Sequence, residues 1–171
     1  EASAWLGMWY ATLSNADFSG ASMQGSYVDF YGSSMPAADF SGATIDATWL
    51  LDMSESDMRS VDFSGASLES SYNLRFSYSD MSGSTFSGAT IASGSGPYYS
   101  WMGFHKSDMT GSDFSGASIK SSYSMGWSYA DLTSADFSGA SIAANYWLGM
   151  WYATLSNADF SGASIQGSYV D

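Results

Sequence analysis

A short phrase built around one Phe recurs along the whole chain. The segment ADFSGAS stands at 16–22, 135–141 and 158–164, and close variants stand at 38–44, 61–67, 84–90 and 112–118. Successive copies lie roughly 23 residues apart, with one longer step between Phe86 and Phe114, and a period of this length is typical of solenoids. In a solenoid each repeat forms one coil and stacks on its neighbours. The repeat therefore predicts about seven stacked coils.

One period divides into shorter units. Residues 130–152 read ADLTS, ADFSG and ASIAA, followed by eight further residues, NYWLGMWY. Each five-residue unit begins with a small residue, continues with a polar one and places a large apolar residue third. Because side chains alternate in direction along an extended backbone, the first and third positions point inward and the second points outward. The strict spacing of five is inconsistent with the i, i+3, i+4 rhythm of an amphipathic helix.

The pattern A-[DN]-L-x-x in these units resembles that of the pentapeptide-repeat family, whose chains wind into a right-handed β-helix with four sides. The resemblance covers nearly the whole chain. It implies an all-β fold, a single right-handed β-helix solenoid over residues 1–171, with seven coils of roughly 22–28 residues each. The fourth side departs from the family pattern, because it has about eight residues and is rich in aromatic residues. We expect a bulged or extended loop there.

Three inward columns follow from this division of the coil. The middle column is the predicted core of the rod, and its members are Phe18, Phe40, Phe63, Phe86, Phe114, Phe137 and Phe160. The two flanking columns are aliphatic or Met and begin at Leu13 and Met23. Seven coils stacked about 4.8 Å apart make a rod about 34 Å long.

A second, longer order of repetition is present. Residues 5–29 recur as residues 147–171 with one difference, Met23 against Ile165. The step from Trp5 to Trp147 defines a super-repeat of six coils, one of which carries an insertion loop at 94–106. Neither end of the sequence carries a capping helix or a charged, Pro-containing segment, and unpaired backbone edges invite another coil to add on. We therefore expect the rod to continue end to end.

The chain is strongly acidic, with 17 Asp and Glu against 4 Lys and Arg and a net charge of −13. This balance opposes binding to nucleic acid or to an anionic membrane surface. No apolar run approaches the roughly 18 residues needed to cross a bilayer. Stacked carboxylates repel, and either hydrogen bonds to neighbouring Ser and backbone groups or bound Ca²⁺ would relieve them. The candidate Ca²⁺ ligands are the outward acids of the middle unit, Asp17, Asp39, Asp62, Asp113, Asp136 and Asp159.

The fourth side gathers most of the aromatic residues. Its tryptophans form the predicted assembly surface, which consists of Trp5, Trp9, Trp49, Trp101, Trp127, Trp147 and Trp151. Such a surface would pack against a neighbouring strand of the same assembly or against carbohydrate, or it would form a second hydrophobic layer under the loops. A column of Ser and Thr from Ser22 to Ser164 lines the third side. It would suit tight turns, order water, or carry O-linked glycans.

Residues for catalysis or for a metal site are sparse. His105 is the only histidine, and Cys is absent. The sequence has no nucleophile elbow and no Gly-rich phosphate loop. The FSGA phrase recurs in every coil, and repetition argues against a catalytic role. We predict no enzymatic activity and no cofactor, with Ca²⁺ at the Asp column as the alternative.

These patterns favour a structural protein: a segment of an extracellular or surface filament assembled from stacked β-helical coils. The expected partner is another copy of the chain, in axial and lateral contacts, with glycans on the Ser and Thr side. The resemblance implies one alternative, because some pentapeptide-repeat proteins are acidic rods that resemble duplex DNA and bind type II topoisomerases. A third interpretation, an ice- or carbohydrate-binding module, rests on the Ser and Thr column alone.

Overall fold

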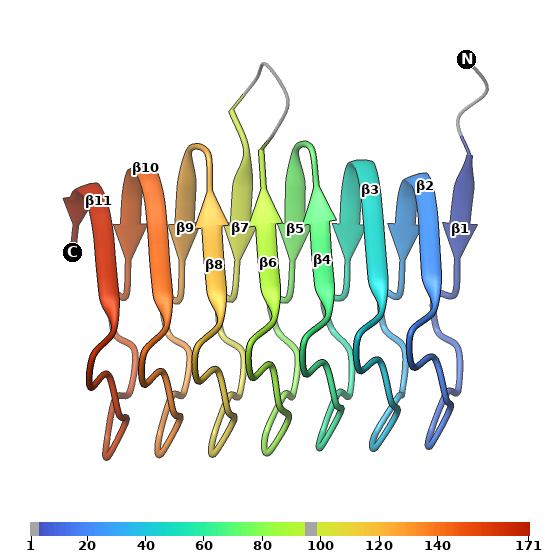
Figure 1. Cartoon of the computed structure of the whole chain (residues 1–171), viewed down its shortest axis with the longest axis horizontal. Helices are drawn as coiled ribbons and strands as arrows, with labels where there is room; N and C mark the ends of the chain where they lie inside the picture. The colour runs from blue at the N-terminus through green and yellow to red at the C-terminus, as the bar shows by residue number, and fades with distance from the viewer. Residues whose placement is uncertain (1–3, 95–98) are drawn as a thin grey trace.

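The structure is a computed structural model that describes residues 4–94 and 99–171. It is a β-solenoid of about seven turns (Figure 1). Its strands are β1 (Trp5–Gly7), β2 (Ser22–Asp29), β3 (Thr44–Asp52), β4 (Ser67–Ser70), β5 (Asn73–Arg75), β6 (Thr90–Ser93), β7 (Trp101–Gly103), β8 (Ser118–Ser121), β9 (Ser124–Gly126), β10 (Ser141–Gly149) and β11 (Ser164–Val170).

All of the strand pairs are parallel, and each strand pairs with strands one coil away. In Figure 1 the chain ascends through β4, β6 and β8 on the near side and descends through β5, β7 and β9 on the far side while it advances towards the C-terminus, so the coil is right-handed. The register places like residues side by side, since Ile45 pairs with Leu68 and Leu68 with Ile91. The predicted all-β solenoid is confirmed. Within the described residues, no helix is long and apolar enough to cross a membrane.

The fourth side is more regular than the sequence division indicates. It contains a short connection followed by a further five-residue unit, for example LDMSE at 51–55. In that coil three successive units end at a residue with positive φ: Glu55 at 56°, Ser60 at 57° and Gly65 at 63°. These left-handed residues make three corners, whereas at the fourth the chain runs on as a strand, as in β3. A coil of ordinary length is therefore four units of five plus a connection of three, and the expected extended loop is reduced to this connection.

The insertion is shorter than the range 94–106 suggests. Trp101–Gly103 forms β7, which pairs in register with β5 and β9. Met102 and Phe104 are fully buried in the inward columns, as are Leu74 and Phe76 one coil earlier. The regular coil therefore resumes by Trp101, because these side chains are needed to fill the interior. Residues 95–98 of the insertion lie outside the described residues.

The Phe column runs through the middle of the rod as a continuous stack. Ring centroids of successive members lie 4.5–5.0 Å apart, at interplanar angles of 2–19°. Five of the seven rings are fully or almost fully buried, while Phe18 and Phe160 are half-buried because their coils have a neighbour on one side only. Burying a ring of this size contributes about 2–3 kcal/mol. The stack is therefore a major source of stability.

A buried row of Ser hydroxyls ties successive coils together at one corner. Ser33, Ser56, Ser79 and Ser107 occupy the small first position of their units and are almost fully buried. Each hydroxyl donates to a backbone carbonyl of the preceding coil, for instance Ser56 Oγ to Phe30 O at 2.9 Å and Ser79 Oγ to Met53 O at 2.8 Å. Buried hydroxyls need such partners, and each bond is worth about 1 kcal/mol net.

Candidate functional site

The outward Asp column of the middle unit is held by local hydrogen bonds. In each coil that carries this Asp, its Oδ1 accepts the backbone N–H of the residue two positions later. The distance is 2.8 Å from Ser64 N to Asp62 Oδ1 and 2.7 Å from Ser138 N to Asp136 Oδ1. Asp side chains commonly form this turn with the backbone that follows them. The pattern explains why an Asp precedes six of the seven Phe residues, and in the remaining coil Thr85 Oγ1 accepts the N–H of Ser87 at 3.3 Å.

These hydrogen bonds bear directly on the six candidate Ca²⁺ ligands, Asp17, Asp39, Asp62, Asp113, Asp136 and Asp159. At the two end coils, bonds from Ser19 and Ser161 lower the pKa of Asp17 and Asp159, so both carboxyl groups are favoured in the charged form. No group of three or more acidic or imidazole side chains in residues 4–94 and 99–171 is arranged to hold a metal ion. These hydrogen bonds already relieve part of the repulsion between the carboxylates, and Ca²⁺ binding at this column is the untested alternative.

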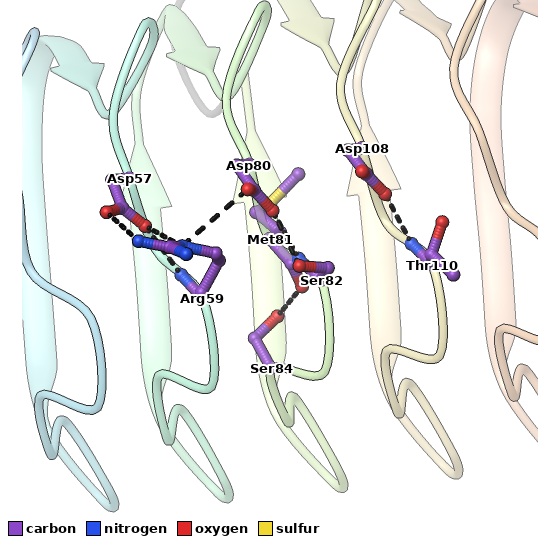
Figure 2. A network of polar contacts seen from close by, with 8 residues as sticks. All are labelled: Asp57, Arg59, Asp80, Met81, Ser82, Ser84, Asp108 and Thr110. Carbon is purple, nitrogen blue, oxygen red and sulfur yellow. Dashed lines mark hydrogen bonds and ion pairs between the residues drawn. The ribbon is translucent and has the colours of Figure 1, made fainter.

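The adjoining side carries a second Asp column, and the side chain of Arg59 lies among its carboxylates (Figure 2). Arg59 binds Asp57 through two contacts of 2.8 Å, from Nε to Oδ1 and from Nη2 to Oδ2, and its Nε lies 3.7 Å from Asp80 Oδ2 in the next coil. Bonding to Arg59 lowers the pKa of Asp57 and raises that of Arg59. A bidentate Arg thus relieves the repulsion between two stacked carboxylates. Beyond it, Asp80 and Asp108 accept from the N–H groups of Ser82 and Thr110.

Six of the seven tryptophans of the predicted assembly surface are exposed or partly exposed on the fourth side. Trp5, Trp9 and Trp151 are more than half exposed, Trp49 and Trp101 are exposed to 44% and 38%, and Trp147 is half-buried. Trp127 is wrong as a member of this surface, because it is fully buried. It occupies the inward third position of the fourth unit, where its ring stacks on Phe104 at 5.0 Å. Its Nε1 has no hydrogen-bond partner in the structure as described.

Sequence reasoning placed every aromatic residue of this side in one group, whereas the structure separates them by direction. Phe30, Phe76, Phe104 and Trp127 point inward at the third position of the fourth unit. Tyrosines at its fifth position, such as Tyr78 and Tyr129, are about half exposed. The signal that could have separated them was the five-residue spacing, which continues through the fourth side. It was hidden because Leu, Met or Val replaces Ala at the first position of that unit.

The indoles of Trp101 and Trp147 lie over a column of glycines. A Cβ built on Gly149 would come within 1.9 Å of the Trp147 ring, and one built on Gly103 within 2.5 Å of the Trp101 ring. Both rings reach towards Gly126 in the coil between them. Their centroids lie 5.9 Å apart, with the planes 13° apart. Glycine at the outward second position therefore makes room for tryptophan, where other coils carry Asp or Arg.

Tyrosines form a second outward feature on this side. Tyr99, Tyr123, Tyr146 and Tyr169 come from successive coils, and we call this set the tyrosine ladder. Its consecutive ring centroids are 4.5, 4.9 and 5.3 Å apart. In the neighbouring column His105 lies between Tyr78 and Tyr129, with edge-on contacts of 5.5 and 5.6 Å. The single histidine thus packs between aromatic rings, and Lys106 lies over the same two tyrosines.

Stacked parallel coils of four five-residue units, with a continuous Phe column in the interior, define a β-solenoid consistent with a pentapeptide-repeat β-helix. No protein-family model matches the sequence, and no curated protein matches it. Similar solved structures include a trypsin-treated form of QnrB1, a plasmid-mediated fluoroquinolone resistance protein, at 14% identity and a TM-score of 0.45, covering 96% of this chain and 90% of that one.

Two further solved structures are described as pentapeptide repeat proteins. One comes from the thylakoid lumen of Arabidopsis thaliana, at 23% identity and a TM-score of 0.33, covering 82% of this chain and 65% of that one. The other is HetL, involved in heterocyst differentiation regulation in the cyanobacterium Nostoc, at 18% identity and a TM-score of 0.23, covering 93% and 86% of the two chains. At these identities the likeness concerns the fold alone.

Proposed function

We propose that the chain is a structural protein, a segment of a filament in which β-helical coils stack end to end. The observation that carries this proposal is the near-identity of residues 5–29 and 147–171. Within the rod, the coil of 5–29 is covered by the coil that follows it, with Phe18 stacked on Phe40 at 4.7 Å. The coil of 147–171 offers the same side chains, so a coil equivalent to 30–52 fits against it.

The contact between the coils of 5–29 and 30–52 shows which groups would form the proposed contact at the coil of 147–171. The backbone N–H groups of Leu13 and Phe18 donate to the next coil, at 2.7 Å each, to Ser34 O and Asp39 O. The corresponding N–H groups belong to Leu155 and Phe160. Burial of apolar surface, at about 25 cal/mol per Å², adds to these hydrogen bonds. The apolar groups available are Leu155, Ile165 and Val170, which are exposed to 43%, 40% and 58%.

The partner in this proposal is another six-coil unit, supplied by more of the same chain or by a neighbouring copy. Such a contact joins two different surfaces of the unit, so it is heterologous and does not close. Growth therefore gives a fibre instead of a ring or a two-fold dimer. The exposed tryptophans remain available for lateral contacts between rods. Location outside the cell and O-linked glycans on the Ser and Thr column belong to the same proposal.

One observation supports the alternative function, an acidic protein that mimics DNA. Two adjacent sides carry Asp columns, and Arg59 is the only basic residue on those columns in the described part of the chain. A rod of this charge suits a DNA-mimicking protein that binds a type II topoisomerase. That alternative requires a discrete particle of defined length, whereas the filament requires continued stacking.

Electron microscopy and sedimentation of two matched variants test the filament. Leu155→Lys places a charge on the inward side of the coil, whereas Thr154→Lys places it on the exposed neighbouring position. We expect the unmodified chain and Thr154→Lys to elongate with concentration and Leu155→Lys to remain short. Equal elongation of both variants would contradict the axial contact. A compact two-fold dimer at high concentration would support the DNA-mimic alternative instead.

A further inference from the structure

The tyrosine ladder sets phenol rings of successive coils against one another on the outside of the rod. Tyr123 and Tyr146 are parallel, with centroids 4.9 Å apart and planes 6° apart. Tyr99 lies 4.5 Å from Tyr123 on the other side. Pairing of β8 and β9 with β10 holds the backbones of these two coils in register on both sides of the rings. The contact is thus fixed by the stacking of the coils.

The ladder is open to reagents in solution. Tyr99 and Tyr146 are exposed to 79% and 46%, and Tyr123 between them is half-buried. Partial burial and the neighbouring phenols Tyr146 and Tyr99 raise the pKa of Tyr123, so its phenol is neutral at physiological pH. Cysteine, which would compete for oxidants, is absent from the sequence. Most methionines of the rod are fully buried in its interior.

Paired phenols have a defined one-electron chemistry. Each tyrosine loses one electron and one proton to give a phenoxyl radical, and two radicals couple through a carbon–carbon bond between their ortho positions. The coupled rings then regain aromaticity as a dityrosine. In balance, two tyrosines and one hydrogen peroxide give one dityrosine and two waters, with a haem peroxidase as the electron carrier. Coupling requires two radicals in contact, and positioning replaces a chance encounter by a neighbour in place.

We propose that the tyrosine ladder is a site of oxidative cross-linking, at which a peroxide-dependent one-electron oxidant joins Tyr123 to Tyr146 and to Tyr99. The link bridges successive coils within one molecule, so it does not depend on the filament proposed above. Its effect is mechanical, because a covalent bond between two coils resists their separation along the rod axis. Tyr78 and Tyr129 form the internal comparison, since His105 separates them.

The sequence offers a sharp assay for these links. Trypsin cuts after the four basic residues, so Tyr99 lies in the fragment 76–106 and Tyr123 and Tyr146 lie in 121–171. A Tyr99–Tyr123 link joins the two fragments. A Tyr123–Tyr146 link lowers the mass of 121–171 by two hydrogens, and tandem spectra distinguish it from a link between Tyr129 and Tyr152, whose rings are 5.0 Å apart in the same fragment. Haem peroxidase with hydrogen peroxide is the oxidant, followed by dityrosine fluorescence and tandem mass spectrometry on dilute, monomeric protein.

We expect both links in the unmodified protein, at a yield that does not change with protein concentration. Tyr123→Phe keeps the ring but loses both links, whereas Tyr78→Phe, in the neighbouring column, keeps them. Tyr146→Phe provides a second variant, which loses the Tyr123–Tyr146 link in the tandem spectra of 121–171 but keeps the joined fragments. Links at Tyr123 that form only between molecules, joined fragments that persist in Tyr123→Phe, or dityrosine confined to other positions would overturn the proposal.

Discussion

The ring of Phe114 lies parallel to the ring of Phe86 in the preceding coil, with centroids 4.5 Å apart and 5° between the planes. Phe137 repeats this relationship on the other side of Phe114, at 4.9 Å and 5°. One Phe in each coil, at the same position of the same unit, is therefore enough to build a continuous aromatic column. Register, core and solenoid axis all follow from the spacing of this residue.

Removing a central ring from the column should be costly. Phe114 is fully buried between two rings, and Phe114→Ala should lower the free energy of unfolding by about 3–5 kcal/mol, because the coils above and below cannot close the cavity. Phe160 is only half-buried, so Phe160→Ala is the matched control and should lower the free energy of unfolding clearly less. Denaturant unfolding measures both values. A loss below about 1 kcal/mol for Phe114→Ala in a folded protein would contradict its role in the core.

The corners make a prediction about backbone strain. Ser60 and Gly65 both adopt positive φ, at 57° and 63°, and a Cβ on Gly65 would meet no atom within 4 Å. Left-handed backbone costs a residue with a Cβ about 1–2 kcal/mol. Gly65→Ala should therefore destabilise by about that amount without any steric clash, and Ser60→Gly should be neutral or stabilising. Thermal unfolding of the two variants tests this, and an equal loss for both would show that the corners do not limit stability.

The Phe column and the solenoid could be predicted from the sequence because a strict period fixes which residues share a face. The fourth unit could not, since Leu51 and Met102 stand where the other units have Ala or Ser, and a large first position obscures the pattern. Trp127 was misplaced for the same reason. Its inward direction depends on counting five-residue steps through a side that also holds a short connection. The Ser33 and Ser56 hydroxyl bonds depend on how adjacent coils align, which composition does not specify.

Acid should weaken the Asp57–Arg59 contact. The folded pKa of Asp57 lies below its ordinary value because Arg59 binds the charged form. Its contribution to stability is therefore present above the ordinary Asp pKa and is lost as the pH falls through the folded pKa. Arg59→Gln should flatten this part of the stability curve, whereas Lys120→Gln, whose parent residue makes no ion pair in the described structure, should not. Unfolding followed between about pH 6 and pH 2 checks the difference. Equal curves for the two variants would show that the pair does not contribute.

Calcium removal should leave the melting temperature unchanged. Each Asp of the middle column already accepts a backbone N–H, as Asp39 does from Ser41 at 2.8 Å. A ligand that bound only the folded state would raise the melting temperature with its concentration. Scanning calorimetry with chelator and with added Ca²⁺ measures this. A higher melting temperature in Ca²⁺, reversed by chelator, would instead assign the column as a metal site.

The axial repeat of the assembled fibre tests the central claim most directly. Residues 5–29 and 147–171 are separated by six coils, so a rod that continues through this duplication repeats every six coils. At about 4.8 Å per coil, helical reconstruction from electron micrographs should give an axial rise of about 29 Å per six-coil repeat. A helical symmetry unrelated to six coils, or a discrete dimer in place of a fibre, would contradict the account.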